Sequence, residues 1–292
     1  SPVKKSAQDR FRLSDMLCTT KGQVNVSMPG ALSIMQENVN QLDEWASKRE
    51  AFLSKGKKTV QAKMLDLLGL KGLPDHKIRI EATGHDSMRE YEQYKFQLIR
   101  EGEMPVPCIL IMPSRANADS PVELRLQEEG KGTYLSEYAN LAAALTEGKI
   151  LLLADLRGLG ETTDPAFYTD AKYWNREYRN AMVSMHIGRP IMGQRVVDIL
   201  TLLDFCSEHE FLKEHPVKVF ANGIYGPVAI HAAYLDERIS SVEIKHSVKT
   251  WKEYIERPMQ WDMYSNVLYG ALKYYDLPDL IRLSNRPIRF AD

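Results

Sequence analysis

The residues most suited to chemistry lie in one segment, 217–236, with the sequence VKVFANGIYGPVAIHAAYLD. A short apolar strand is predicted to run into a tight turn of small residues, and a helix follows that turn. In a nucleophile elbow, the same strand, turn and helix carry G-x-S-x-G, and the strained turn exposes a serine that attacks carbonyl carbon. Residues 221–225 place Gly223 at the serine position, and glycine has no side chain with which to attack. The segment therefore predicts the scaffold of an elbow without its nucleophile.

Three other side chains are candidates for the missing chemistry. Tyr225 lies two residues beyond Gly223, but a phenol with a pKa near ~10 is a poor nucleophile without strong activation, so we expect it to pack or to line the cleft. Cys206 falls near the end of a predicted helix, and we expect it in the core. His246 follows a predicted strand and is the one histidine expected to reach a cleft at the carboxyl edge of the sheet, with a polar loop residue as the alternative.

The same turn also half-matches the dinucleotide fingerprint G-x-G-x-x-G, as Ala221-x-Gly223-x-x-Gly226. Glu243 lies at about the distance at which an acidic residue would contact a ribose. The first glycine is replaced by alanine, and several strands precede the motif, whereas the fingerprint belongs in the first βαβ unit. Nucleotide binding is therefore an alternative hypothesis, from a different functional class than attack on a carbonyl carbon.

Strands and helices alternate from residue 76 onward, which predicts a mostly parallel sheet with helices on both faces. The segment 150–154 is fully apolar, as is typical of a strand buried inside a parallel sheet. The predicted strands are 77–82, 91–100, 106–112, 122–127, 150–154, 217–220, 241–245 and 287–290. The main predicted helices are 135–145, 191–206, the helix after the elbow, 251–257 and 277–283.

Residues 1–75 have a different character from the rest. The segment 44–70 is rich in Lys, Ala and Leu and predicts a helix or a helix pair that ends at Gly69 and Gly72. Before it, 18–23 is expected to be extended and to contain a turn. We therefore divide the chain into an N-terminal elaboration, 1–75, packed on a core of residues 76–292.

Composition excludes several classes of function. The net charge of −1 leaves no excess of Lys and Arg with which to bind nucleic acid. No apolar run approaches the ~20 residues of a membrane span. The three cysteines, Cys18, Cys108 and Cys206, are far apart and lack metal-site spacing, so we expect buried apolar residues, with neither a metal site nor a disulfide framework.

Four segments together resemble the α/β-hydrolase superfamily and, within it, the acetyl xylan esterase-like carbohydrate esterases and their tandem-domain relatives. They are CTTKGQV at 18–24, DLRGLGE at 155–161, GRPIMGQR at 188–195 running into Asp198, and the elbow itself. The resemblance covers nearly the whole chain in the family's order. It implies an α/β-hydrolase fold, no cofactor, export from the cytoplasm, and removal of short acyl groups from sugars by a serine, a histidine and an acid.

The resemblance can be carried over position by position. It places the nucleophile at Gly223 and one oxyanion donor at the backbone N–H of Ile224. The second donor would come from the turn that holds Gly130 and Lys131. The acid would follow the strand at 287–290, where Asp292 stands, and the histidine would follow a further strand that this sequence does not contain. We therefore expect a degenerate esterase; the alternative is an active carboxylic-ester hydrolase whose catalytic groups are unconventional or supplied from outside this sequence.

Aromatic residues cluster in two insertions that are expected on the ligand-binding edge. Tyr173 and Trp174 belong to the first, and Trp251 and Trp261 belong to the second. Aromatic faces stack on sugar rings, which favours a saccharide cleft, and the alternative is the packing of a lid or an interface. The partners left open by the sequence are an acylated saccharide, a partner domain and a second copy of the chain.

Overall fold

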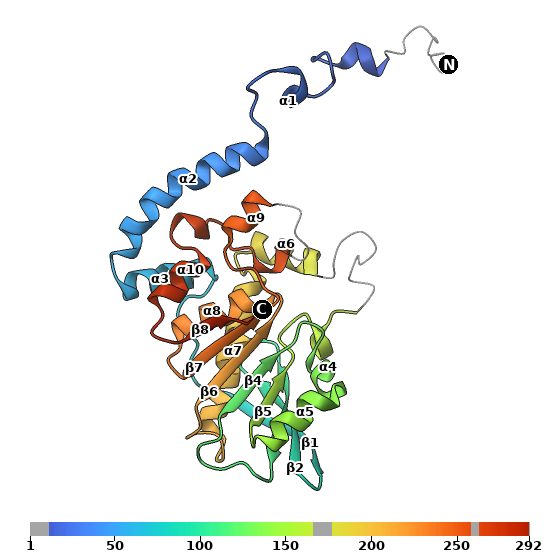
Figure 1. Cartoon of the computed structure of the whole chain (residues 1–292), viewed down its shortest axis with the longest axis vertical. Helices are drawn as coiled ribbons and strands as arrows, with labels where there is room; N and C mark the ends of the chain where they lie inside the picture. The colour runs from blue at the N-terminus through green and yellow to red at the C-terminus, as the bar shows by residue number, and fades with distance from the viewer. Residues whose placement is uncertain (1–11, 166–176, 258–262, 292) are drawn as a thin grey trace.

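The computed structural model describes residues 12–165, 177–257 and 263–291. Its centre is an eight-stranded sheet with the order β1-β2-β3-β5-β4-β6-β7-β8 (Figure 1). The pairs β1–β2, β2–β3 and β3–β5 are antiparallel, and the remaining neighbours are parallel. The strands are β1 Arg79–Ser87, β2 Tyr91–Ile99, β3 Val106–Pro113, β4 Val122–Leu126, β5 Ile150–Ala154, β6 Val217–Asn222, β7 Ile239–Lys245 and β8 Ile288–Phe290. The predicted mostly parallel sheet is confirmed.

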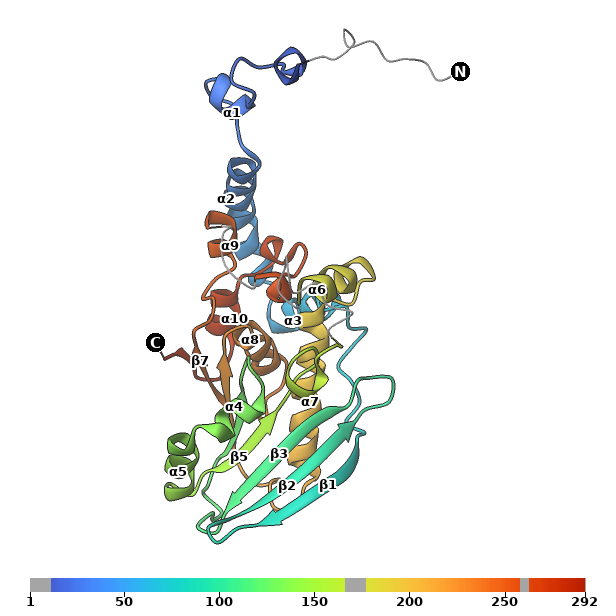
Figure 2. The ribbon, with the colours of Figure 1, turned by 90° about the vertical axis from the view of Figure 1, so that its right-hand side faces the viewer.

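Helices cover both faces of the sheet, and β5 shows why the sequence requires this. All five of its residues are buried, because Leu152 faces the larger core while Leu151 and Leu153 face a smaller one on the opposite side. The larger core is covered mainly by α3 (Lys57–Leu67), α7, α8 and α10, and the smaller by α4 and α5 (Figures 1 and 2). The α-helices of the core are α4 Lys131–Ser136, α5 Tyr138–Thr146, α6 Glu177–His186, α7 Ile191–Glu208, α8 Tyr225–Leu235, α9 Lys252–Glu256 and α10 Leu277–Leu283. Short 3₁₀ turns are η3 Gly160–Thr162, η5 Met263–Asn266 and η6 Ala271–Lys273.

The N-terminal region contains the expected helix pair with different bounds. Helix α2 spans Ile34–Leu53 and α3 spans Lys57–Leu67, so the first helix begins ten residues before the predicted start. The start at Ile34 follows from a capping box: the Ser33 hydroxyl accepts from the N–H of Gln36 at 3.2 Å, and the Gln36 side chain accepts from the N–H of Ser33 at 2.9 Å. Helix α2 packs on η6 and α9.

Residues 12–33, which include η2 Leu13–Met16 and α1 Val24–Ser27, extend away from the body beyond the start of α2 (Figure 2). Cys18 lies in this segment and is exposed, so the expectation that it is buried was wrong. The physical reason is that this part of the elaboration does not pack on the core, whereas α2 and α3 do. Cys108 and Cys206 are buried as expected.

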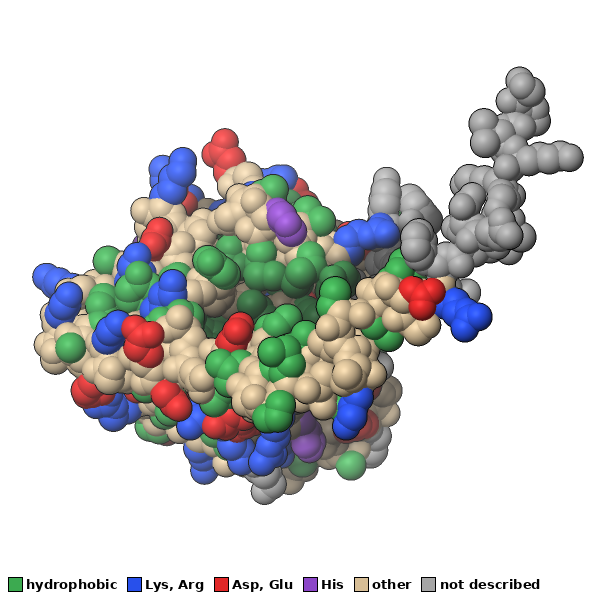
Figure 3. Space-filling model, turned by 90° about the horizontal axis from the view of Figure 1, so that it is seen from above, with side chains coloured by type: hydrophobic (Ala, Val, Ile, Leu, Met, Phe, Trp, Pro, Cys, Tyr) green, Lys and Arg blue, Asp and Glu red, His purple; other side chains and the backbone are tan. Residues whose placement is uncertain are grey.

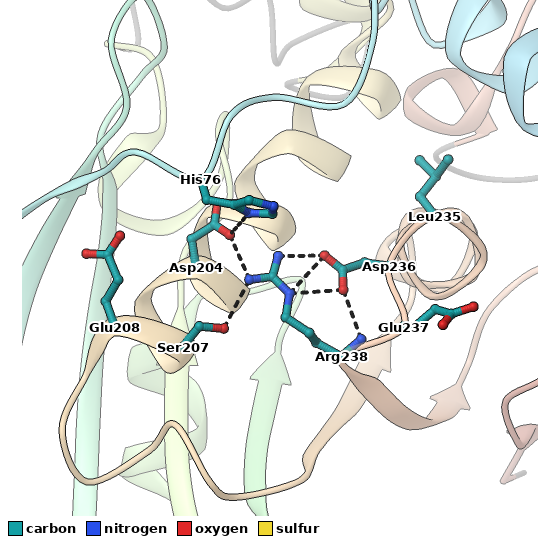
Figure 4. A pocket seen from close by; sticks show the side chains of 8 residues that line it. All are labelled: His76, Asp204, Ser207, Glu208, Leu235, Asp236, Glu237 and Arg238. Atoms are coloured by element: carbon teal, nitrogen blue, oxygen red, sulfur yellow. Dashed lines mark hydrogen bonds and ion pairs between the residues drawn. The ribbon is translucent and has the colours of Figure 1, made fainter.

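A pocket lies at the amino end of β7, opposite the edge at which the elbow lies; Figure 4 shows the side chains that line it. Its volume is about 450 Å³, and several of its polar side chains pair with one another. Arg238 donates to Asp236 and, at 2.7 Å, to Asp204, which also accepts from His76 and Arg100. Burial opposes ionisation of Asp204, but these hydrogen bonds prevail and lower its pKa. The network holds the connection between α3 and β1 against helix α7, so its role is structural.

Candidate functional site

The candidate site lies at the topological switch point of the sheet. Strands β4 and β6 are neighbours, but the chain leaves β4 towards β5 and leaves β6 towards β7 on the other side. Connections that diverge in this way leave a crevice outside the carboxyl ends of the two strands, where ligands bind in open α/β sheets. The residues at that position are Gln127 and Glu128 after β4 and Gly223 after β6, with His246 after the adjacent β7.

The elbow has the predicted strand–turn–helix form. Strand β6 ends at Asn222, Gly223 has a φ of +59°, and α8 begins at Tyr225. The N–H of Gly223 donates to the carbonyl of Lys245 at 3.0 Å, which ties the turn to the end of β7. A left-handed φ is strained for residues with a Cβ, and such strain is typical of functional turns.

Glu128 fills the space that a nucleophile side chain would use. A Cβ on Gly223 would overlap Oε2 of Glu128, far inside the 3.0 Å that real Cβ atoms keep from other atoms. The carboxylate of Glu128 therefore stands over the elbow in the place of a serine hydroxyl, and the side chain is partly exposed. Sequence reasoning missed Glu128; its one signal was its place directly after β4, where the chain turns away from the sheet.

Two amides and an imidazole extend this polar cluster along the edge. The Asn222 side chain donates to Oε1 of Gln127 at 3.2 Å and accepts from Nδ1 of His246 at 3.3 Å. Asn222 thus joins the ends of β4, β6 and β7. His246 is exposed and has a φ of +51°, the one left-handed non-glycine residue in the described chain. The structure therefore brings His246 to the edge beside Gly223, and its catalytic role stays a prediction.

The predicted oxyanion donors differ in what their N–H groups contact. The N–H of Gly130 donates to the carbonyl of Gln127 at 3.0 Å, and that of Lys131 donates to Asp155 at 2.7 Å. Lys131 also reaches Asp155 with its ammonium group at 2.6 Å, so both groups of this buried residue hold the loop. Ile224 precedes the first turn of α8, where backbone N–H groups point outward from the helix end. Of the three predicted donors, Gly130 and Lys131 use their N–H groups in hydrogen bonds within the protein, and Ile224 is the residue directly after Gly223.

Tyr225 points into the protein. Its side chain is fully buried, its ring lies under the guanidinium of Arg195, and burial raises the pKa of its hydroxyl. Cys206 is buried as well, and burial raises the pKa of its thiol to about 12. Neither side chain is in a position or a protonation state suited to attack.

Arg157 belongs to a buried ion network next to the site. Its backbone N–H and its Nε donate to Asp198 at 3.0 Å, and its Nη1 donates to Glu103 at 2.8 Å. Burial acts to lower the pKa of Arg157, but the hydrogen bonds and charge of Asp198 and Glu103 outweigh it and raise the pKa. Arg195 donates to the carbonyl of Arg157 at 3.0 Å. The network fixes the turn after β5 to the start of α7.

Of the four aromatic residues named as cleft candidates, Trp251 lies within the described residues; it is 4 % exposed and packs against His231 and Tyr275. It also contributes to an apolar pocket of about 470 Å³ beside the start of α2. Tyr173, Trp174 and Trp261 lie outside the described residues, and so does Asp292.

Within the described ranges, no three His, Cys, Asp or Glu side chains are grouped as a metal site would require. No described helix is long and apolar enough to cross a membrane.

No protein-family model matches the sequence. No curated protein matches it either. Solved structures do match in fold. A Bacteroides fragilis protein provisionally assigned as an acetyl xylan esterase aligns over 84% of this chain and 68% of its own, with a TM-score of 0.68 and 13% identity. Acetyl xylan esterase 1 from Thermoanaerobacterium sp. aligns over 80% and 77%, with a TM-score of 0.51 and 14% identity. A glucuronoyl esterase from Solibacter usitatus aligns over 80% and 73%, with a TM-score of 0.53 and 12% identity.

These likenesses confirm the resemblance at the level of the fold. The alignments cover 80–84% of this chain, and the identities are too low to transfer an activity. The chain has the α/β-hydrolase fold, in the form shared by acetyl xylan esterases and glucuronoyl esterases.

Proposed function

We propose that this chain is a degenerate carbohydrate esterase-like protein, which keeps the fold and a polar binding edge but not serine-type ester hydrolysis. The observation that carries the proposal is the overlap between Gly223 and Glu128: the nucleophile position lacks a side chain, and a carboxylate takes up its space. Removing the members of a catalytic triad leaves only the weak catalysis of the oxyanion hole and of binding.

The ligand that we propose for the edge is an acylated saccharide. The structural neighbours include proteins named for acetyl xylan and glucuronoyl ester hydrolysis. The cluster of Gln127, Glu128, Asn222 and His246 offers amide, carboxylate and imidazole groups, which pair well with hydroxyls. Binding of acetylated xylo-oligosaccharides, measured by calorimetry, is expected for the wild type and is expected to weaken in Asn222→Ala.

A second function follows from the same geometry. A carboxylate over the elbow is a chemically competent general base, and it could activate water for direct attack on an ester. This would be the active hydrolase with an unconventional group that the sequence left open. The fingerprint hypothesis has less support, because Glu243, its ribose-binding candidate, forms an ion pair with Arg289 on β8.

Acetate release from a short acetyl ester separates the two functions. The variants are Glu128→Ala, Gly223→Ser and the double variant; the matched control is Glu129→Ala, which alters an exposed carboxylate one residue away. The degenerate protein predicts no turnover above buffer for the wild type, Glu128→Ala and Glu129→Ala. Turnover by the wild type that Glu128→Ala abolishes and Glu129→Ala preserves would establish the active hydrolase instead. The double variant shows whether a serine becomes productive once its space is cleared.

A further inference from the structure

The segment 12–33, named here the arm, has an unusually apolar surface. Of the sixteen large hydrophobic side chains exposed in the described structure, seven belong to this segment of 22 residues. They are Leu13, Met16, Leu17, Val24, Val26, Met28 and Leu32. Its charged residues are Arg12, Asp15 and Lys21. A concentration of exposed apolar side chains of this kind marks an interaction site in a folded protein.

An apolar groove opens at the root of the arm. The pocket of about 470 Å³ lies between the start of α2 and the elements α9, η5 and η6. Seen from above, hydrophobic side chains gather around a hollow on the face from which the arm extends (Figure 3). The groove is lined almost entirely by apolar side chains, among them Ile34, Met35, Ile255, Val267 and Leu272. The arm and the groove therefore match in chemistry, and Ile34 and Met35 make their apolar surfaces continuous.

The arm is directed away from the groove of its own chain. The capping box between Ser33 and Gln36 fixes the path by which the chain enters α2, since it uses both the N–H and the hydroxyl of Ser33. Farther along, α2 is anchored on η6 and α9. With the helix fixed and its cap formed, the arm continues beyond the helix start, as Figure 2 shows. The residues that line the groove all lie at or beyond residue 34, outside the arm.

We propose that the arm docks in the groove of a second copy of this chain, in a reciprocal exchange about a twofold axis. Such an exchange is self-complementary, because each copy supplies one arm and one groove. The seven arm side chains are 45–74% exposed, which corresponds to roughly 250–450 Å² of apolar area per arm. Two arms and the two surfaces that they cover bury about 1,000–1,800 Å², which falls in the range of stable dimers.

Mass measurement by light scattering after size exclusion tests the exchange. The wild-type chain is expected to elute at twice its 33.4 kDa mass. The arm variant Met28→Glu/Leu32→Glu and the groove variant Val267→Glu are each expected to be monomeric, since a homodimer of either contains no intact arm–groove pair. Ile255→Glu serves as a second groove variant, and circular dichroism checks that each variant is folded. Phe211→Glu is the matched control, because Phe211 is 59% exposed but lies beyond α7, outside the arm and groove.

Mixing the two monomeric variants gives the decisive result. The arm variant supplies an intact groove and the groove variant supplies an intact arm, so the mixture is expected to form a heterodimer with one docked arm. A groove variant that stays dimeric would show arm-to-arm association and overturn the proposal. A monomeric wild type at ~100 μM, or a mixture that stays monomeric, would overturn it too. None of these outcomes depends on whether the chain hydrolyses esters.

Discussion

At the scale of single residues, the turn after β6 combines a backbone requirement with a requirement for space. Gly223 has a left-handed φ of +59°, and Glu128 occupies the volume into which a side chain would project. The two residues lie far apart in the sequence, and the sheet order places them together because β4 and β6 are neighbours. A glycine is thus needed at position 223 for its φ and for its lack of a side chain, and the free-energy cost of losing each can be measured separately.

The substitution Gly223→Ala is expected to destabilise the fold by about 1–3 kcal/mol: left-handed strain supplies most of this cost, and displacement of the flexible Glu128 carboxylate adds the rest. In the Glu128→Ala background the overlap disappears and only the strain remains, so the cost of the same substitution is expected to fall to about 1–2 kcal/mol. Denaturant unfolding of the four proteins in this cycle measures the coupling. Equal costs in both backgrounds would show that the carboxylate does not occupy the space of the missing side chain.

At the scale of elements, the start of α7 lies close against the end of α3. A Cβ on Gly193 would overlap the carbonyl oxygen of Leu68, so the helix surface must be bare at this point. Gly69, with a φ of +71°, has Gly188 and Pro190 as its neighbours in the same contact. The contact fastens the N-terminal elaboration to the core, and it explains why residue 193 is a glycine.

We expect Gly193→Ala to cost about 1–3 kcal/mol, because the backbone carbonyl of Leu68 cannot move aside as a flexible side chain would. The control is Gly132→Ala in α4, where a Cβ would meet nothing within 4 Å. There the higher helix propensity of alanine is expected to stabilise by up to about 1 kcal/mol. Thermal or denaturant unfolding gives both values, and a destabilised Gly132→Ala together with a neutral Gly193→Ala would contradict this packing.

The sequence predicted elements better than it predicted contacts. The helix at 277–283 and the strand at 150–154 match the structure, because periodicity and turn residues are local signals. The segment 135–145 was predicted as one helix, but α4 and α5 are separate helices that meet at Glu137. The elbow was predicted from its small residues, whereas Glu128 was not, because its role arises from a parallel pairing between distant strands. The exposure of Cys18 was missed for the same reason, since burial is decided by packing.

At the scale of the whole molecule, the larger core encloses a histidine. His231 on α8 is fully buried, and burial lowers its pKa from 6.5 to about 4. Its Nδ1 donates to the carbonyl of Pro227 at 2.7 Å, and its Nε2 accepts from the hydroxyl of Tyr275 at 3.1 Å. These partners suit the neutral imidazole, so the folded state excludes a proton that the unfolded chain binds.

This exclusion predicts a loss of stability in acid. Since the pKa of His231 is lower in the folded than in the unfolded state, the free energy of unfolding is highest above pH 6.5. It falls by up to about 3 kcal/mol as the pH decreases towards 4. His231→Leu is expected to be less stable at pH 7, because it leaves the Tyr275 hydroxyl without this partner, but to have a flatter pH dependence between 6.5 and 4. His186→Gln, which changes an exposed histidine, should retain the wild-type slope. The same pH dependence of the free energy of unfolding in the wild type, His231→Leu and His186→Gln would contradict the prediction.

The order of the strands in the sheet also determines when each strand can pair during synthesis of the chain. Strand β4 needs β6 to complete its pairing, yet roughly ninety residues separate the end of one from the start of the other. The hairpins β1–β2–β3 are complete long before, since they join consecutive segments. At about 5–20 residues per second, β4 waits on the order of ten seconds on the ribosome with one edge unpaired. A nascent chain halted before residue 217 would therefore expose that edge to other chains, and the vulnerable period ends when the strand that carries the elbow emerges.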